Sequence, residues 1–335
     1  MGVRWGLVST AAINHEILVG ARASDRVDIT TVASRTQERA DAYAAANGIP
    51  RAHGSYDALL DDPEVDAVYI STPNDSHVPL TVQALEAGKH VLVEKPFSRH
   101  AAQVEAACTL AESKGLMLSE AFMWRHNPQT AKLTELVASG AIGRIVTVRA
   151  SFGFDLEGLR GSADTRFDPA LDGGGMMDVG CYCLNGIRLI TGAEPERVSA
   201  EQIVGPSGVD VAFAATMRMS GVMLGQFECS FITTHRDELE VIGEEGSLFV
   251  DDPWHCWEPG IELRRHTGME HRDGVGVERI AVPVADSYRL QLENLTDAIE
   301  GRATLLNGPD EAIKQARAVE ALYLAAESGT SVVLS

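Results

Sequence analysis

Short apolar strands alternate with amphipathic helical segments through residues 3–121 of the sequence. Consecutive parallel strands need a crossover connection, which is usually a helix, so this alternation is typical of βαβ units wound onto both faces of one sheet. The sequence therefore predicts an α/β fold that begins with a doubly wound parallel (Rossmann) sheet. Its strands are predicted at residues 3–8, 27–33, 67–71, 90–93 and 117–121.

The pattern changes after residue 143, where strands follow one another with short turns and little helix between them. Such a succession predicts a large, mainly antiparallel sheet. Two helical patterns, at residues 288–300 and 311–328, close the chain. We therefore expect a dinucleotide-binding domain at residues 1–122 and an α+β domain for substrate binding and dimerisation at residues 123–335. The later strands are predicted at residues 145–152, 196–203, 211–219, 222–231, 239–242, 247–250, 261–265 and 279–284.

Composition excludes several partners. The 335 residues carry a formal net charge of -20, which repels nucleic acids and anionic membranes. No apolar run approaches the length of a membrane span, and the sequence enters its first strand without a charged and apolar leader. The five cysteines lack paired metal spacing, and the ten histidines lack ligand spacing. We therefore expect a cytoplasmic protein with reduced thiols and no metal site.

Two polar motifs stand where predicted strands of the first sheet end. Glu94-Lys95-Pro96 follows residues 90–93, and Thr72-Pro73-Asn74 follows residues 67–71, with His77 one turn later. Ligands of open α/β sheets bind at the carboxyl ends of the strands. The bland alternatives are a surface ion pair for Glu94 and Lys95, helix capping for Asn74 and a satisfied helix-start histidine for His77.

Together these motifs resemble the Gfo/Idh/MocA oxidoreductases, dinucleotide-dependent enzymes of sugars and cyclitols. The stretch Glu86-Ala87-Gly88-Lys89-His90-Val91 stands between them in the family's order. The resemblance extends over nearly the whole chain. It implies that Asn74 and His77 lie near the nicotinamide and Glu94 near its ribose, and that Trp124 and Arg125 contact the cofactor. For the last two, packing at a domain junction is the alternative.

The phosphate-binding turn should follow the first strand, where Ser9-Thr10-Ala11-Ala12-Ile13 stands. Compared with the family's G-x-G-x-x-G/A pattern, Ser9, Ala11 and Asn14 replace all three glycines. Ser and Ala are still small enough for a backbone to approach a pyrophosphate, and the helix amino terminus offers N–H donors. The alternative is an ordinary strand-to-helix turn.

The second strand ends in Ser34-Arg35-Thr36, where an NAD enzyme usually has Asp or Glu. A hydroxyl residue and an arginine suit the 2′-phosphate of NADP, because arginine binds phosphate through charged hydrogen bonds. We therefore predict NADP as the preferred cofactor, with NAD as the alternative. Arg35 as a solvated helix-start residue is the competing interpretation.

Three polar residues align on a helix predicted just after Gly173-Gly174-Gly175. Asp178, Tyr182 and Asn185 fall at i, i+4 and i+7, one face of an α-helix. This indicates a lined cleft, whereas a buried polar network, with Asp178 as a helix-dipole partner, is the alternative.

The family's pattern here is G-G-x-x-x-D-x-G-x-H-x-x-D, and the chain departs from it twice. Tyr182 stands where many members carry the catalytic His, and Asn185 where they carry a second Asp. Tyrosine at this place is shared with the dimeric dihydrodiol and D-xylose 1-dehydrogenase-like branch and with the glucose–fructose branch. The resemblance therefore implies oxidation of an aldose or a cyclic diol, and a homodimer or homotetramer formed through the C-terminal sheet.

Oxidising an alcohol by hydride transfer needs a base for the hydroxyl proton and a positive group for the developing alkoxide. Free Tyr, with a pKa near ~10, becomes a better base beside an ammonium group. Our hypothesis is that Tyr182 exchanges the proton, Lys95 polarises the oxygen and tunes Tyr182, and Asp178 orients a second hydroxyl.

We expect a polyhydroxylated ring as substrate, most simply an aldopyranose oxidised at C1. Arg166 and Trp124 are candidate substrate contacts, although Arg166, with Arg160 and Asp164, also reads as part of a solvated loop. Two rival functions stay open: an oxo-sugar (anhydrofructose-type) reductase, and a non-enzymatic nucleotide-responsive regulator.

Overall fold

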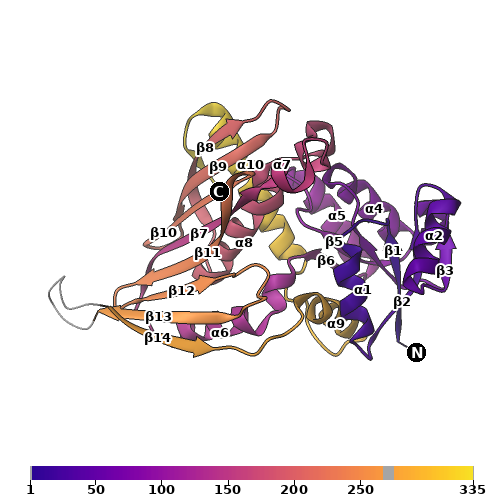
Figure 1. Cartoon of the computed structure of the whole chain (residues 1–335), viewed down its shortest axis with the longest axis horizontal. Coiled ribbons are helices and arrows are strands. Elements are labelled where there is room, and N and C mark those ends of the chain that lie inside the picture. The colour runs from indigo at the N-terminus through magenta and orange to yellow at the C-terminus, as the bar shows by residue number, and fades with distance from the viewer. Residues whose placement is uncertain (1, 267–274, 335) are drawn as a thin grey trace. The chain divides into compact units, whose positions relative to one another are not determined.

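The computed structural model describes residues 2–266 and 275–334, which form two compact units (Figure 1). Unit 1 comprises Met1–Met123 and Asp286–Ala316, and unit 2 comprises Trp124–Ala285 and Arg317–Ser335. The predicted division after residue 122 treats the chain as two consecutive segments. It does not include the return of Asp286–Ala316 to unit 1.

Unit 1 contains a six-stranded parallel sheet in the order β3-β2-β1-β4-β5-β6. The order reverses between β1 and β4, so the predicted doubly wound sheet is confirmed. The sequence pattern missed β3 because it has three half-buried residues and no apolar run. The strands are β1 Val3–Val8, β2 Val27–Ala33, β3 Arg51–His53, β4 Ala67–Ile70, β5 His90–Glu94 and β6 Leu118–Ala121.

Two apolar clusters cover the faces of this sheet. One lies beneath α4 and α5 and includes Ala312 and Ala316. The other lies beneath α1 and includes Leu292 and Leu295 of α9. Helices α1 and α9 lie side by side (Figure 1), and a Cβ added at Gly20 would stand 2.7 Å from the backbone nitrogen of Arg289. The helices are α1 Asn14–Arg22, α2 Gln37–Asn47, α3 Tyr56–Leu60, α4 His77–Glu86, α5 Ala101–Lys114, α9 Ser287–Ile299 and α10 Pro309–Ser328.

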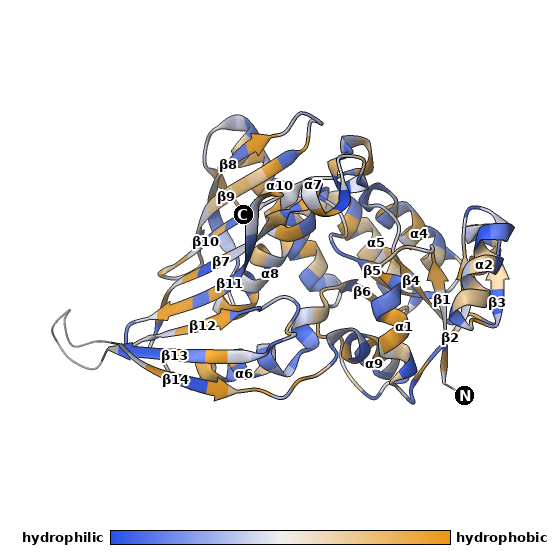
Figure 2. Ribbon diagram, viewed as in Figure 1, coloured by the Kyte–Doolittle hydropathy of each residue, from blue (hydrophilic) through white to orange (hydrophobic). Residues whose placement is uncertain are grey.

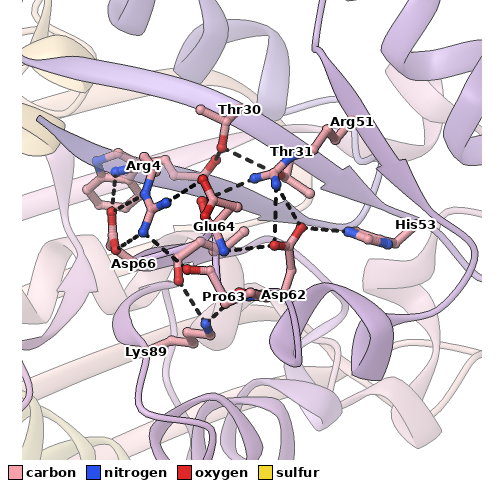
Figure 3. Close-up of polar contacts among 12 residues, drawn as sticks. Arg4, Thr30, Thr31, Arg51, His53, Asp62, Pro63, Glu64, Asp66 and Lys89 are labelled. Atoms are coloured by element: carbon pink, nitrogen blue, oxygen red, sulfur yellow. Dashed lines mark hydrogen bonds and ion pairs between the residues drawn. The ribbon is translucent and has the colours of Figure 1, made fainter. Parts of the chain in front are cut away.

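A polar cluster fixes the amino edge of the same sheet (Figure 3). Arg4, near the start of β1, donates to both carboxylate oxygens of Asp66 at 2.8 and 2.7 Å. Lys89, just before β5, is buried and donates to the carbonyl oxygens of Asp62 and Val65 at 2.7 and 2.8 Å. Burial lowers the pKa of Lys89, against the opposite effect of the nearby carboxylates. These bonds satisfy backbone groups that the strand ends leave open.

Unit 2 is built on a sheet with nine strands in its described part, in the order β14-β13-β12-β11-β7-β10-β9-β8-β15. Neighbouring strands are antiparallel except β7 and β10, which pair in parallel and make the sheet mixed. Hydrophobic and hydrophilic residues alternate along several of these strands (Figure 2), as expected for a sheet with one buried face. The strands are β7 Ile145–Asp155, β8 Pro195–Val204, β9 Asp210–Met219, β10 Met223–Ser230, β11 Ile232–Gly243, β12 Ser247–Asp251, β13 Gly260–His266, β14 Val275–Ala281 and β15 Val332–Val333.

Helix α8 packs on the buried face of this sheet, against β7 and β10. A π-helical turn, Met176–Gly180, leads directly into it. The α-helices that lie wholly in this unit are α6 Pro128–Ala138, α7 Leu156–Arg160 and α8 Cys181–Thr191, and the last part of α10 also belongs to it. No helix in the described ranges has the length and apolar character needed to cross a membrane. All five cysteines are buried as free thiols.

A buried aspartate holds the start of the π turn. Asp210 of β9 is 4% exposed and accepts a hydrogen bond from the Met176 N–H at 2.6 Å and another from the Tyr323 hydroxyl at 2.9 Å. An anion at this end of a helix is stabilised by the free N–H groups and the dipole. Gly174 makes room for it, with a φ of 132° and a Cβ position 2.2 Å from Asp210 Oδ1.

We predict that Gly174→Ala destabilises the protein much more than Gly161→Ala does. Gly161 also has a positive φ, of 80°, but nothing lies within 4 Å of its Cβ position. Gly161→Ala should therefore cost only backbone strain, about 1–2 kcal/mol in the free energy of unfolding. Gly174→Ala also pushes against Asp210 and should cost at least ~2 kcal/mol more. Urea unfolding measures both variants, and equal costs would contradict the close approach.

Candidate active site

The turn after β1 has a glycine-like backbone although residues 9–13 include no glycine. Ser9 has a φ of 126°, in the region that favours glycine. Its hydroxyl accepts from the Ala11 N–H at 3.1 Å and lies 2.8 Å from the Ser71 hydroxyl. The Asn14 amide donates to the Ser9 carbonyl oxygen at 2.9 Å, and its Oδ1 accepts from the Ser71 hydroxyl at 2.6 Å. These buried side chains tie the end of β1 to the end of β4.

This network leaves donors for an anion at the start of α1. The N–H groups of Ala12 and Ile13 make no hydrogen bond within the described residues. Neither Ala11 nor Ala12 has a side chain beyond Cβ, so a phosphate can approach the backbone. Free N–H groups at a helix amino terminus form an anion-binding site. The turn therefore fits a dinucleotide pyrophosphate without the glycine fingerprint.

After β2, the positively charged side chain of Arg35 makes no interaction with the other described residues. Ser34 is buried, and its N–H donates to the His53 carbonyl oxygen. Thr36 caps α2 by accepting from the Arg39 N–H at 3.4 Å. Arg35 is exposed and has no hydrogen bond or ion pair to any other described residue. Its guanidinium is available to a ligand.

The prediction did not include Arg39, a second arginine, which contacts the turn after β1. The Arg39 Nε donates to the Thr10 hydroxyl at 2.9 Å, which joins α2 to the turn after β1. From the sequence alone, an arginine in the first turn of a helix cannot be distinguished from an ordinary exposed side chain. Only the fold brings it beside a residue 29 positions earlier.

His77 links the two loops that carry the predicted motifs. Its ring is buried, with Nδ1 2.8 Å from the Pro96 carbonyl oxygen and Nε2 2.8 Å from the Thr72 carbonyl oxygen. Burial lowers the pKa of His77, against the opposite effect of the two carbonyl groups. The arrangement favours the satisfied-histidine alternative over direct cofactor contact. His77 thereby positions the loop that contains Lys95, whose peptide bond to Pro96 is cis.

Two further side chains hold the loop after β5. The Tyr69 hydroxyl donates to Glu94 Oε1 at 2.5 Å, while the Lys95 N–H donates to Glu94 Oε2 at 3.2 Å. Glu120 of β6 is buried and accepts from the Phe97 N–H at 2.9 Å. The prediction included neither Tyr69 nor Glu120, because both stand inside strands. In the loop after β4, the hydroxyl oxygen of Thr72 is buried and has no hydrogen-bond partner within the described part of the chain.

In unit 2 the predicted helix face begins in a π turn. Asp178 lies within Met176–Gly180, where hydrogen bonds run from residue i to i+5, and Tyr182 and Asn185 lie in α8. The i, i+4, i+7 spacing of an ideal α-helix therefore does not hold across the start of the predicted face. Tyr182 is 7% exposed and Asn185 is 1% exposed.

Asp178 belongs to an ion-pair network. Arg166 donates to Asp178 Oδ2 at 3.1 Å and binds both carboxylate oxygens of Asp164 at 2.8 and 3.1 Å. The hydrogen bond from Arg166 and its charge hold the pKa of Asp164 below its usual range. Arg166 is only partly exposed, so it is not a solvated loop residue. The carboxylate of Asp210 already accepts from the Met176 N–H at the start of the helical segment. An interaction with the helix dipole is therefore not needed to explain Asp178.

Tyr182 stands in an aromatic wall. Its ring centroid lies 5.6 Å from that of Phe152 and 6.0 Å from that of Trp254. Trp124 is 1% exposed and packs edge-on against Trp254 at 5.3 Å, which favours its packing alternative, while Arg125 is half-buried. The prediction did not include Phe152 and Trp254, because in the sequence an aromatic residue of a strand or loop cannot be distinguished from an ordinary core residue.

Comparison with known proteins agrees with this geometry. The Gfo/Idh/MocA description "Oxidoreductase family, NAD-binding Rossmann fold" matches residues 3–122, and the "GFO/IDH/MocA C-terminal domain" matches residues 130–249. A D-xylose 1-dehydrogenase (NADP(+)) of Haloferax volcanii is 35% identical over 98% of this chain and 99% of its own. A trans-1,2-dihydrobenzene-1,2-diol dehydrogenase of Danio rerio is 30% identical over 96% of this chain and 94% of its own.

Solved structures agree as well. A 3-ketoreductase of Actinomadura kijaniata, in complex with NADP and TDP-benzene, has a TM-score of 0.89 at 26% identity, over 97% of this chain and 98% of that one. The expected family, its dihydrodiol and xylose dehydrogenase branch and the two-part fold are thereby confirmed. The chain belongs to the Gfo/Idh/MocA family of oxidoreductases.

Proposed function

We propose that this enzyme oxidises a ring hydroxyl of a sugar or cyclic diol with NADP, most simply C1 of an aldopyranose. The observation that carries the proposal is the ion-pair network in which Arg166, held by Asp164 on the preceding loop, binds Asp178 of the π turn that leads into the helix of Tyr182. In this proposal the fixed carboxylate and the phenol of Tyr182 act on neighbouring hydroxyl groups of one substrate. The names of the xylose and dihydrodiol dehydrogenase relatives support the same substrate class.

Unit 1 provides the groups that would hold the cofactor. The N–H groups of Ala12 and Ile13 suit the pyrophosphate, and Arg35 beside Ser34 and Thr36 suits the 2′-phosphate. The NADP named for the xylose dehydrogenase relative supports this preference. Asn74 and Glu94 of this unit, and Trp124 and Arg125 of unit 2, stay predicted contacts. When bound, the nicotinamide accepts the hydride.

The chain's own residues manage the proton and the charge. In this proposal Tyr182 takes the hydroxyl proton, Lys95 supplies the positive charge that stabilises the developing oxyanion, and Asp178 orients a neighbouring hydroxyl. Arg166 and Asp164 hold that carboxylate in one orientation. Such preorganisation limits the reorganisation that would otherwise accompany the reaction.

The reverse reaction is the second candidate. The name of the 3-ketoreductase among the structural relatives supports reduction of a keto group. An oxo-sugar would then be the substrate, because the same proton donor and cation serve reduction. Rates with aldoses and NADP, compared with rates with oxo-sugars and NADPH, decide between the directions.

Cofactor preference provides a direct test of Arg35. Arg35→Ser should weaken NADP binding by about 10- to 100-fold, because one charged hydrogen bond to the 2′-phosphate is lost. Binding of NAD, which lacks that phosphate, is the internal control and should be unchanged. Fluorescence titration measures both constants. A wild-type enzyme that binds NAD as tightly as NADP would refute the preference.

Two substitutions test the proton and charge assignments. Tyr182→Phe removes the proton acceptor, and Lys95→Ala removes the positive charge, so each should lower kcat by at least ~10²-fold. NADP binding should persist in both variants. Lys114→Ala, on the exposed surface of α5, is the matched control and should keep full turnover. Stopped-flow absorbance of NADPH measures the rates, and normal turnover in either test variant would contradict its assignment.

We also propose that a second copy of the chain covers the outer face of the nine-stranded sheet. That face carries the in-register row Gln226, Arg149, Glu240, Phe249, Glu262 and Arg279, and exposed Leu224 lies on the same side of β10. A wide sheet face that mixes charges with apolar side chains suits a two-fold contact. Light scattering should give the mass of two or four chains, and the mass of one chain would overturn this proposal.

A further inference from the structure

A continuous series of ring contacts leads from Tyr182 to a histidine outside the predicted site. Phe152 packs edge-on against Tyr182 at 5.6 Å, and the His255 ring packs against Phe152 at 5.6 Å and 90°. His255 then stacks on Trp257 at 4.2 Å and 16°. Phe152 is therefore held between the candidate proton acceptor and an imidazole, all within unit 2.

A buried carboxylate holds that imidazole. Asp237 of β11 is 5% exposed, and its Oδ2 lies 3.2 Å from His255 Nδ1. Its Oδ1 is buried and has no hydrogen-bond partner in the described part of the chain. Burial raises the pKa of Asp237, and the hydrogen bond from His255 acts in the opposite direction. A buried carboxylate with so few partners is costly unless its one donor stays in place.

Several hydrogen bonds fix the conformation of the loop that contains His255. Asp252, with a φ of 77°, accepts from the N–H groups of His255 and Cys256 through Oδ1, at 3.1 and 2.9 Å. Its Oδ2 accepts from the N–H groups of Trp257 and Glu258. Gln129 of α6 braces the same loop by donating to the Asp252 carbonyl oxygen at 3.0 Å. Movement of His255 away from Asp237 is therefore restricted.

A metal ion is the competing explanation of this cluster. Ligand atoms of Asp237, Asp252 and His255 lie within 4.8 Å of one another, which would suit a divalent cation. Each Asp252 oxygen, however, already accepts two backbone N–H bonds. A carboxylate oxygen has two lone pairs, so Asp252 has little capacity left for a metal. The hydrogen-bonded pair Asp237–His255 is the better description.

We infer that Asp237 and His255 form a positioning pair, which holds Phe152 against Tyr182 and so fixes the phenol for proton transfer. The inference rests on the proposed role of Tyr182. Neither member of the pair need touch the substrate, because the effect passes through the Phe152 ring. Small displacements of a reacting group reduce rates strongly, so loss of this support should lower turnover more than binding.

Removing the hydrogen-bond donor tests the pair. His255→Leu keeps bulk beside Phe152 but cannot donate to Asp237, and it should lower kcat by about 10- to 100-fold while KM for NADP stays unchanged. His255→Asn places an amide nitrogen near the position of Nδ1 and should recover most of that loss. His100→Leu, which removes an exposed histidine just before α5, is the matched control and should keep the wild-type kcat.

A spectroscopic measurement separates this inference from the proposed function. The near-ultraviolet circular dichroism of wild type minus that of Tyr182→Phe reports the environment of the Tyr182 ring. The same difference measured in the His255→Leu background should be clearly smaller, even if no tested sugar is oxidised. An unchanged difference, or an unchanged kcat in His255→Leu, would overturn the inference. Loss of wild-type activity with a chelator and its recovery with zinc would replace the pair by a metal site.

Discussion

The hydrogen bonds among Ser9, Asn14 and Ser71 are the constraint on which the chemistry of unit 1 depends. They tie the ends of β1 and β4 together and keep Ser9 at a backbone conformation that serine rarely adopts. Glycine would reach that conformation without help, whereas serine needs partners that hold it there. The side chains thus replace the conformational freedom of the missing glycines, and the N–H groups of Ala12 and Ile13 remain available to an anion.

In unit 2 a charged side chain fixes the backbone of a turn. The π turn before α8 leaves N–H groups that need an acceptor, and buried Asp210 provides it. Asp178, within the same turn, pairs with Arg166. Two carboxylates near one helix start thereby serve different purposes. Asp210 accepts from the backbone, and Asp178, four residues before Tyr182 in the sequence, pairs with an arginine.

Local sequence patterns were sufficient to predict the main helices and strands and to recognise the family. Strand 90–94 and its motif Glu94-Lys95-Pro96 are continuous in sequence, so residue order alone reveals them. Arg39, Asp210 and Asp237 could not be found in this way, because their partners lie far along the chain or on another element. The same reason explains the parallel pairing of β7 with β10, which are separated by β8 and β9. The π turn also escaped prediction, since its residues have an ordinary helical pattern.

The last fifty residues of the chain serve both units, and this has a consequence for biosynthesis. Helix α9 contributes Leu292 and Leu295 to the core beneath α1, and Tyr323 of α10 donates to the aspartate at the start of the π turn. Neither core is complete until these helices have left the ribosome. The nascent polypeptide must therefore expose apolar sheet surface until these helices have been synthesised, a period in which chaperones and early aggregation compete for it.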